Sequence, residues 1–141
     1  MTTAYWCVLV AALIPIIWAG VAKAGAKGFD NARPRDYLAR LEGWRQRANW
    51  AQANSYESFP PFAAGVIIAH LAGAAQPTID MLALGYVAAR ILYGIFYIAD
   101  RAGMRSLAWV AGLACIIGLF VAAACGNPAA LRSAGDGRQL K

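Results

Sequence analysis

Charged side chains are scarce in this chain. Of its 141 residues 14% are charged and 60% are hydrophobic, and it holds one histidine and three cysteines. The lone histidine and the wide spacing of the cysteines give no metal-ligand pattern, so no metal site is expected. So little charge and so much apolar surface exclude an ordinary soluble domain. The composition and length favour a membrane protein with a single domain over residues 1–141.

In place of charge the chain has four apolar stretches, at about residues 3–22, 56–75, 79–99 and 106–124. Each is close to the roughly 20 residues that a helix needs to cross the hydrocarbon core. A helix also satisfies its own backbone groups there. The sequence predicts an all-α fold, an integral membrane four-helix bundle. Its helices are expected at about 3–24, 35–75, 78–100 and 104–125, followed by a mobile tail at 126–141.

Positive charges are unevenly placed along the chain. They lie between the first two apolar stretches, at Lys23, Lys27, Arg33, Arg35, Arg40, Arg45 and Arg47, and between the last two, at Arg101 and Arg105. The positive-inside rule puts these basic loops in the cytoplasm and both termini outside. Nucleic acid is not an expected partner, because bases beside membrane helices face anionic lipid headgroups. Cys7 and Cys125 fall near the same predicted membrane face, where a disulfide is geometrically possible but not expected.

Two charged side chains lie inside the apolar stretches, Glu57 in the second and Arg90 in the third. A charge at the centre of a spanning helix costs roughly 2.5–3.5 kcal/mol on insertion scales, so such residues usually pair, line a cavity or bind a ligand. Two interpretations stay open: a structural ion pair between helices, or a binding site. His70 has no second ligand near it in the sequence, so we expect it to be a hydrogen-bonded residue.

Helical spacing groups other polar residues with these two charges. Spacings of seven and three residues on the second helix, and of three and four on the third, each define one helix face. Guanidinium, amide, carboxylate and phenol groups together can hold a small zwitterionic molecule. The second-helix face carries Arg47, Asn54 and Glu57, the third carries Arg90, Tyr93 and Tyr97, and Arg105 and Ser106 open the fourth helix.

These residues resemble a known family. The segment 50–62, W-A-Q-A-N-S-Y-E-S-F-P-P-F, resembles the second-helix signature R-A-x-x-N-x-x-E-x-x-P-x-F of the MAPEG family, membrane-associated proteins in eicosanoid and glutathione metabolism. The segments 90–97 (R-x-x-Y-x-x-x-Y) and 101–106 (R-A-G-M-R-S) are similar to the family's third- and fourth-helix elements. Residues 30–35 look like the first loop of bacterial members. The resemblance covers nearly the whole chain.

The resemblance implies a homotrimer in the bacterial inner membrane, with active sites between neighbouring subunits. Glutathione would be the co-substrate, entering from the cytoplasmic side, and lipids or hydrophobic small molecules would approach from the bilayer. The implied activity is that of a membrane glutathione transferase or peroxidase acting on lipophilic electrophiles or lipid hydroperoxides. The hydrophobic substrate itself is not specified by the sequence.

The resemblance also assigns roles by position. Four residues match positions that contact glutathione in the family: Asn54, Glu57, Tyr93 and Tyr97. Arg105 matches the arginine that stabilises the thiolate, and Ser106 matches its serine neighbour. Arg47 and Arg90, from the two polar faces, complete the expected glutathione site. A cation beside sulfur favours the thiolate, which is the nucleophile.

The chain departs from the family signature at its start. Trp50 stands where the signature has arginine, and Ala53 where some members have another. Arg47, one turn earlier, matches an upstream basic position and is expected to compensate. The departure keeps two alternatives open: a non-catalytic lipid-binding protein of the same fold, and a structural subunit of a membrane complex.

Overall fold

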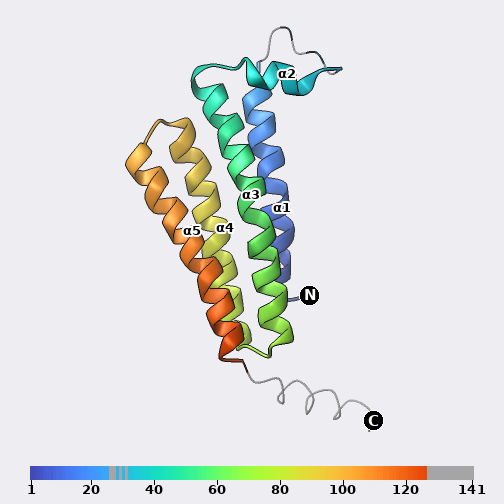
Figure 1. Cartoon of the computed structure of the whole chain (residues 1–141), viewed down its shortest axis with the longest axis vertical. Coiled ribbons are helices and arrows are strands. Elements are labelled where there is room, and N and C mark those ends of the chain that lie inside the picture. The colour runs from blue at the N-terminus through green and yellow to red at the C-terminus, as the bar shows by residue number, and fades with distance from the viewer. Residues whose placement is uncertain (26–27, 29, 31, 127–141) are drawn as a thin grey trace.

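A computed structural model describes residues 1–25, 28, 30 and 32–126. In this part of the chain every regular element is a helix, which confirms the all-α prediction: α1 (Thr3–Lys23), α2 (Pro34–Ala39), α3 (Gly43–Leu71), α4 (Gln76–Ile98) and α5 (Ala102–Ala124). The four long helices run side by side, and the short α2 lies at one end of the pair formed by α1 and α3 (Figure 1). Apart from Gly126, the expected tail lies outside the described residues.

Three described helices, α1, α4 and α5, are long and apolar enough to cross a membrane. The prediction of four such helices is therefore met by three of them. The fourth, α3, has 29 residues but is less apolar, because its sequence carries charged and amide side chains along much of its length. It nevertheless packs against α1, α4 and α5.

The prediction of one unbroken helix over residues 35–75 was wrong. The chain leaves the helical path between α2 and α3, and Gly43 at the start of α3 has φ of +60°. Glycine adopts this left-handed conformation without a steric penalty. Just before it, Leu41 turns inward to a cluster with Ala22 and Ala48. The other three helices agree with the predicted bounds to within two residues.

Small residues let the helices pack closely. Ala4, Ala69 and Ala83 are fully buried in the core between α1, α3 and α4. A methyl group at Gly94 would clash with the ring of Trp18, so glycine is required where α1 crosses α4. Close packing of this kind is the main source of helix association in lipid, where apolar burial alone gives no preference for protein over lipid.

Hydrogen bonds tie three helices together where the chain starts. We name Thr2, Tyr5, His70, Gln76 and Asp80 the terminal cluster. The Asp80 carboxylate accepts from the backbone N–H of Ala4 at 2.7 Å and from Gln76 Nε2 at 2.9 Å. His70 Nδ1 donates to the Val66 carbonyl at 2.8 Å, and Nε2 lies 3.1 Å from Thr2 Oγ1. His70 is thus hydrogen-bonded, as expected, and it stacks on Tyr5 at 4.3 Å between ring centroids.

The N-terminus, the α3–α4 connection and the end of α5 lie at this same end of the molecule (Figure 1). The opposite end holds α2 and the turn between α4 and α5. All three cysteines are free, so Cys7 and Cys125 form no disulfide.

Candidate functional site

Three adjoining cavities lie among α3, α4 and α5, in the half of the bundle away from the terminal cluster. The inner cavity, about 210 Å³, includes Asn54, Glu57, Ser58, Tyr86, Arg90 and Trp109 in its wall. The aromatic recess, about 360 Å³, is lined by Trp50, Ala53, Asn54, Glu57, Tyr93 and Tyr97. The arginine cavity, about 450 Å³, is lined by Tyr93, Tyr97, Arg105, Ser106, Trp109 and Val110. Each shares lining residues with the other two, so the three cavities adjoin one another.

An amide joins the two charges that lie within the apolar stretches. Arg90 Nη2 donates to Asn54 Oδ1 at 2.8 Å, and Asn54 Nδ2 donates to Glu57 Oε2 at 3.2 Å. Arg90 is only 2% exposed, whereas Glu57 is exposed. Within the described chain the direct Glu57–Arg90 ion pair is therefore not formed, because Asn54 lies between a buried cation and a surface carboxylate. The Nε of Arg90 is buried without a hydrogen-bond partner there.

Two arginines flank a pair of tyrosine rings in the same region. The Arg90 guanidinium lies 4.3 Å from the centroid of Tyr93, whose ring meets that of Tyr97 edge-on at 5.5 Å. The Arg105 guanidinium lies 4.5 Å from the centroid of Tyr97. Contacts of this type attract a cation to the electron-rich ring face and stabilise its position. The two tyrosines therefore separate a buried arginine from a partly exposed one.

Comparison with known protein families identifies the family of this chain. The sequence model of the MAPEG family matches residues 3–125, which takes in all five helices and all three cavities. The chain belongs to the MAPEG family. Among curated proteins no match to the sequence is found. Family membership and the three apolar helices make this an integral membrane protein.

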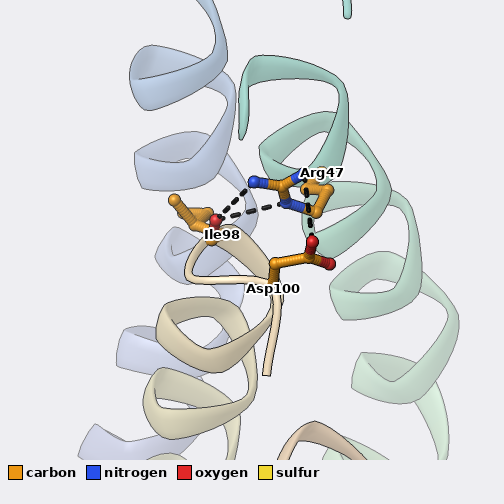
Figure 2. Close-up of polar contacts among 3 residues, drawn as sticks. All are labelled: Arg47, Ile98 and Asp100. Atoms are coloured by element: carbon orange, nitrogen blue, oxygen red, sulfur yellow. Dashed lines mark hydrogen bonds and ion pairs between the residues drawn. The ribbon is translucent and has the colours of Figure 1, made fainter. Parts of the chain in front are cut away.

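One expected site residue of this MAPEG chain lies outside the three cavities. Arg47 Nε and Nη2 donate to the carbonyl of Ile98 at 3.2 and 3.1 Å, and Nη1 lies 3.9 Å from the Asp100 carboxylate (Figure 2). The last carbonyls of a helix have no partner within the helix, and the guanidinium supplies one. In the described chain Arg47 caps the end of α4, and its expected binding role stays a prediction.

The other expected residues line the cavities. Asn54, Glu57, Arg90, Tyr93, Tyr97, Arg105 and Ser106 all contribute to their walls. Two of them differ from expectation, because their polar groups are hydrogen-bonded within the chain. Arg90 is buried and holds Asn54 in place, and the Ser106 hydroxyl donates to the carbonyl of Ala102 in its own helix at 3.1 Å.

Sequence reasoning missed Ser58, Tyr86 and Trp109. The Tyr86 hydroxyl donates to Ser58 Oγ at 3.0 Å in the wall of the inner cavity, and its ring stacks on Phe62. Tyr86 lies four residues before Arg90, so helical spacing already placed it on the same face. Trp109 lies four residues after Arg105, so helical spacing placed it on the same face as Arg105.

The charges around the three cavities suit a ligand with two ends of opposite sign. Glu57 offers a carboxylate in the aromatic recess, and Arg105 offers a guanidinium in the arginine cavity. The rings of Tyr93 and Tyr97 form the wall that the two cavities share. Among the described residues no group of three or more histidine, cysteine or acidic side chains gathers in one place.

Proposed function

We propose that this protein is a membrane-embedded, glutathione-dependent transferase or peroxidase that acts on lipophilic electrophiles or lipid hydroperoxides. The observation that carries the proposal is the placement of Arg105. Its guanidinium lines the arginine cavity and contacts the Tyr97 ring, and in the described structure it has no hydrogen bond or ion pair with another residue. A guanidinium held by a ring but not neutralised is suited to stabilise an anion.

The proposed chemistry uses Arg105 as the catalytic residue. Its charge favours the thiolate of a bound thiol, which is the nucleophile. In the transferase reaction the sulfur bonds to an electrophilic carbon while the leaving group departs with the bonding electrons. In the peroxidase reaction two thiols reduce one hydroperoxide to an alcohol and water and become a disulfide.

The proposed co-substrate, glutathione, fits the room and groups that the cavities offer. The aromatic recess and the arginine cavity, about 360 and 450 Å³, lie in the size range of small-molecule sites. Asn54 and Glu57 line the recess, and Arg90 acts as a positioning residue that fixes the Asn54 amide. Trp50 and Glu57 in the recess wall are exposed, so a neighbouring subunit of a proposed homotrimer could reach them.

We further propose that α3 is a fourth spanning helix, in the bacterial inner membrane, with the α2 end in the cytoplasm. The even number of passages agrees with the N-terminus and the end of α5 lying at one end of the molecule (Figure 1). The exposed bases Arg33, Arg35 and Arg101 lie at the other end, where the positive-inside rule requires them.

Cysteine labelling tests this orientation. In a cysteine-free background, Ala75→Cys, in the α3–α4 connection, should react with an impermeant maleimide on intact cells. Ala32→Cys, before α2, should react only after permeabilisation. The reverse pattern would place the cavities on the wrong side for cytosolic glutathione.

The activity itself is tested on purified wild-type protein in lipid vesicles. We expect glutathione-dependent conjugation of chlorodinitrobenzene or reduction of linoleic acid hydroperoxide, above the rate in protein-free vesicles. Protein that binds fatty acid but shows neither reaction with glutathione or another low-molecular-weight thiol would favour the non-catalytic lipid-binding alternative.

A further inference from the structure

The aromatic recess has an unusual wall. Three of its six lining residues, Trp50, Tyr93 and Tyr97, are aromatic, and its one charged lining residue, Glu57, is a carboxylate. The Trp50 ring lies 6.0 Å from that of Tyr97 and is tilted toward it by 48°. Aromatic faces attract cations and gain nothing from anions. The recess therefore offers a cation two kinds of favourable contact.

The nearby guanidiniums do not offer a matching site for an anion. Arg90 is 2% exposed, and its Nη2 is committed to Asn54. Arg47 is bound at the end of α4 by Ile98 and Asp100. Arg105 lies in the neighbouring arginine cavity, beyond the Tyr97 ring. Within the described subunit, a carboxylate placed in the recess would face Glu57 with no accessible arginine beside it.

Trp50 affects this balance, because an arginine at its exposed position in the recess wall would bring a cation to the opening. Its side chain is 46% exposed and lines the recess beside Ala53. An exposed tryptophan of a membrane protein can also be a simple interface anchor. Trp44, six residues earlier and 42% exposed, is consistent with such an anchor, because it contacts Arg45 and does not line the recess.

We infer that the aromatic recess selects the ammonium end of the thiol co-substrate and discriminates against a carboxylate at that end. This inference rests on the proposed function and names its substrate class: low-molecular-weight thiols that carry an ammonium group, without an adjacent carboxylate, at the end remote from sulfur. The ammonium lies beside Glu57 and the rings of Trp50 and Tyr97, and the sulfur lies in the arginine cavity beside Arg105. Glutathione, whose ammonium and α-carboxylate share one carbon, is accepted less well than such a thiol.

Two thiols that differ only at this carbon test the inference. They are glutathione and γ-aminobutyryl-cysteinyl-glycine, which is glutathione with its γ-glutamyl α-carboxylate replaced by hydrogen. On wild-type protein we expect kcat/KM for the second thiol to exceed that for glutathione by about threefold or more. Trp50→Arg should shift this ratio toward glutathione by about tenfold, the size of one added charge contact in a partly desolvated site.

Control variants separate the recess from general effects. Trp44→Arg makes the same chemical change on the same helix outside the recess and should leave the ratio unchanged. Trp50→Phe keeps an aromatic face and should keep the preference. Glu57→Gln removes the carboxylate and should reduce it, which gives a second test if Trp50→Arg fails to fold.

The outcomes separate this inference from the proposed function. Wild-type protein that prefers glutathione, with a ratio that Trp50→Arg does not move, would overturn the inference and leave the proposed function standing. If neither thiol is turned over, the proposed function fails. Calorimetric affinities of the wild-type protein for the two thiols then decide the inference, and equal or tighter binding of glutathione overturns it.

Discussion

The carboxylates of Asp80 and Glu57 show two different uses of polar residues in one bundle. Asp80, in the terminal cluster, accepts hydrogen bonds from Ala4 and Gln76 and joins α1 to α4. Glu57, in the aromatic recess, is exposed and has one hydrogen bond, from Asn54 of its own helix. The first carboxylate is satisfied by the fold, whereas the second keeps acceptor capacity for something outside the chain.

The imidazole and the guanidinium groups of the two halves differ in the same way: His70 is fully hydrogen-bonded, whereas two arginines near the cavities are not. Both ring nitrogens of His70 have hydrogen-bond partners in the terminal cluster. In the other half, Arg90 Nε is buried without a partner in the described structure, and Arg105 has a ring contact alone. Buried polar groups in native proteins are nearly always paired, so the unpaired Nε of Arg90 in a cavity wall agrees with the proposed ligand site.

The largest effect is expected from Arg105→Ala. Removal of one electrostatic stabiliser costs about 10²-fold or more in turnover. Stability should fall by no more than about 1 kcal/mol, the size of the lost contact with the Tyr97 ring. Arg105→Lys should be intermediate, because an ammonium lacks the planar fork of a guanidinium. Steady-state conjugation kinetics measure both. Arg101→Ala, outside the three cavities in the preceding turn, is the control, and an equal loss there would remove the distinction between the two arginines.

The terminal cluster should show the opposite response. Asp80→Ala leaves the buried N–H of Ala4 without its acceptor, which costs about 1–3 kcal/mol. We expect a lower unfolding temperature in detergent and unchanged kcat below that temperature. The exposed Asp36 supplies the control, Asp36→Ala. A loss of kcat in folded Asp80→Ala protein would show that the terminal cluster takes part in function.

An intermediate loss of stability is expected for Tyr86→Phe, in the wall of the inner cavity. It removes one partly buried hydrogen bond to Ser58 and keeps the ring on Phe62, for a loss of about 1 kcal/mol in the free energy of unfolding. Tyr5→Phe removes a hydroxyl from the terminal cluster but keeps the ring on His70. Denaturant titration in mixed micelles should therefore give the smaller change for Tyr5→Phe, and the reverse order would contradict the assigned contacts.

The smallest change in stability is expected for Glu57→Gln. An exposed carboxylate with one hydrogen bond contributes less than about 1 kcal/mol, so the unfolding temperature should change little. The KM for the thiol should rise nonetheless, because the recess loses its charged residue. A large fall in stability would instead indicate that Glu57 is paired with a neighbouring subunit of the proposed homotrimer.

The sequence was sufficient to predict α1, α4 and α5, because each of these apolar stretches has the length of a membrane helix. It did not predict the break before α3, since that break depends on Leu41 packing against Ala22 and Ala48, a contact between distant segments. Helical spacing also placed Asn54, Glu57, Tyr93 and Tyr97 correctly on the cavity wall.

Helical spacing predicted which residues share a helix face, but it did not predict how far along the helix axis each contact lies. Arg47 shares a helix face with Asn54, but it lies seven residues away, about 10 Å along the axis, and reaches the end of α4. Spacing also left a direct Glu57–Arg90 ion pair open, since it gave no indication that Asn54 lies between them. Residue order alone did not distinguish a polar residue that caps a helix from one that faces a cavity.

The most direct test of the account is the ultraviolet thiolate absorbance that appears when glutathione is added to purified protein. We expect the band in wild-type protein and in Asp80→Ala below its unfolding temperature, because the terminal cluster serves only the fold. The band should be lost in Arg105→Ala. No band in wild-type protein, or an equal band in Arg105→Ala, would contradict the assignment of the arginine cavity as the site of the thiolate.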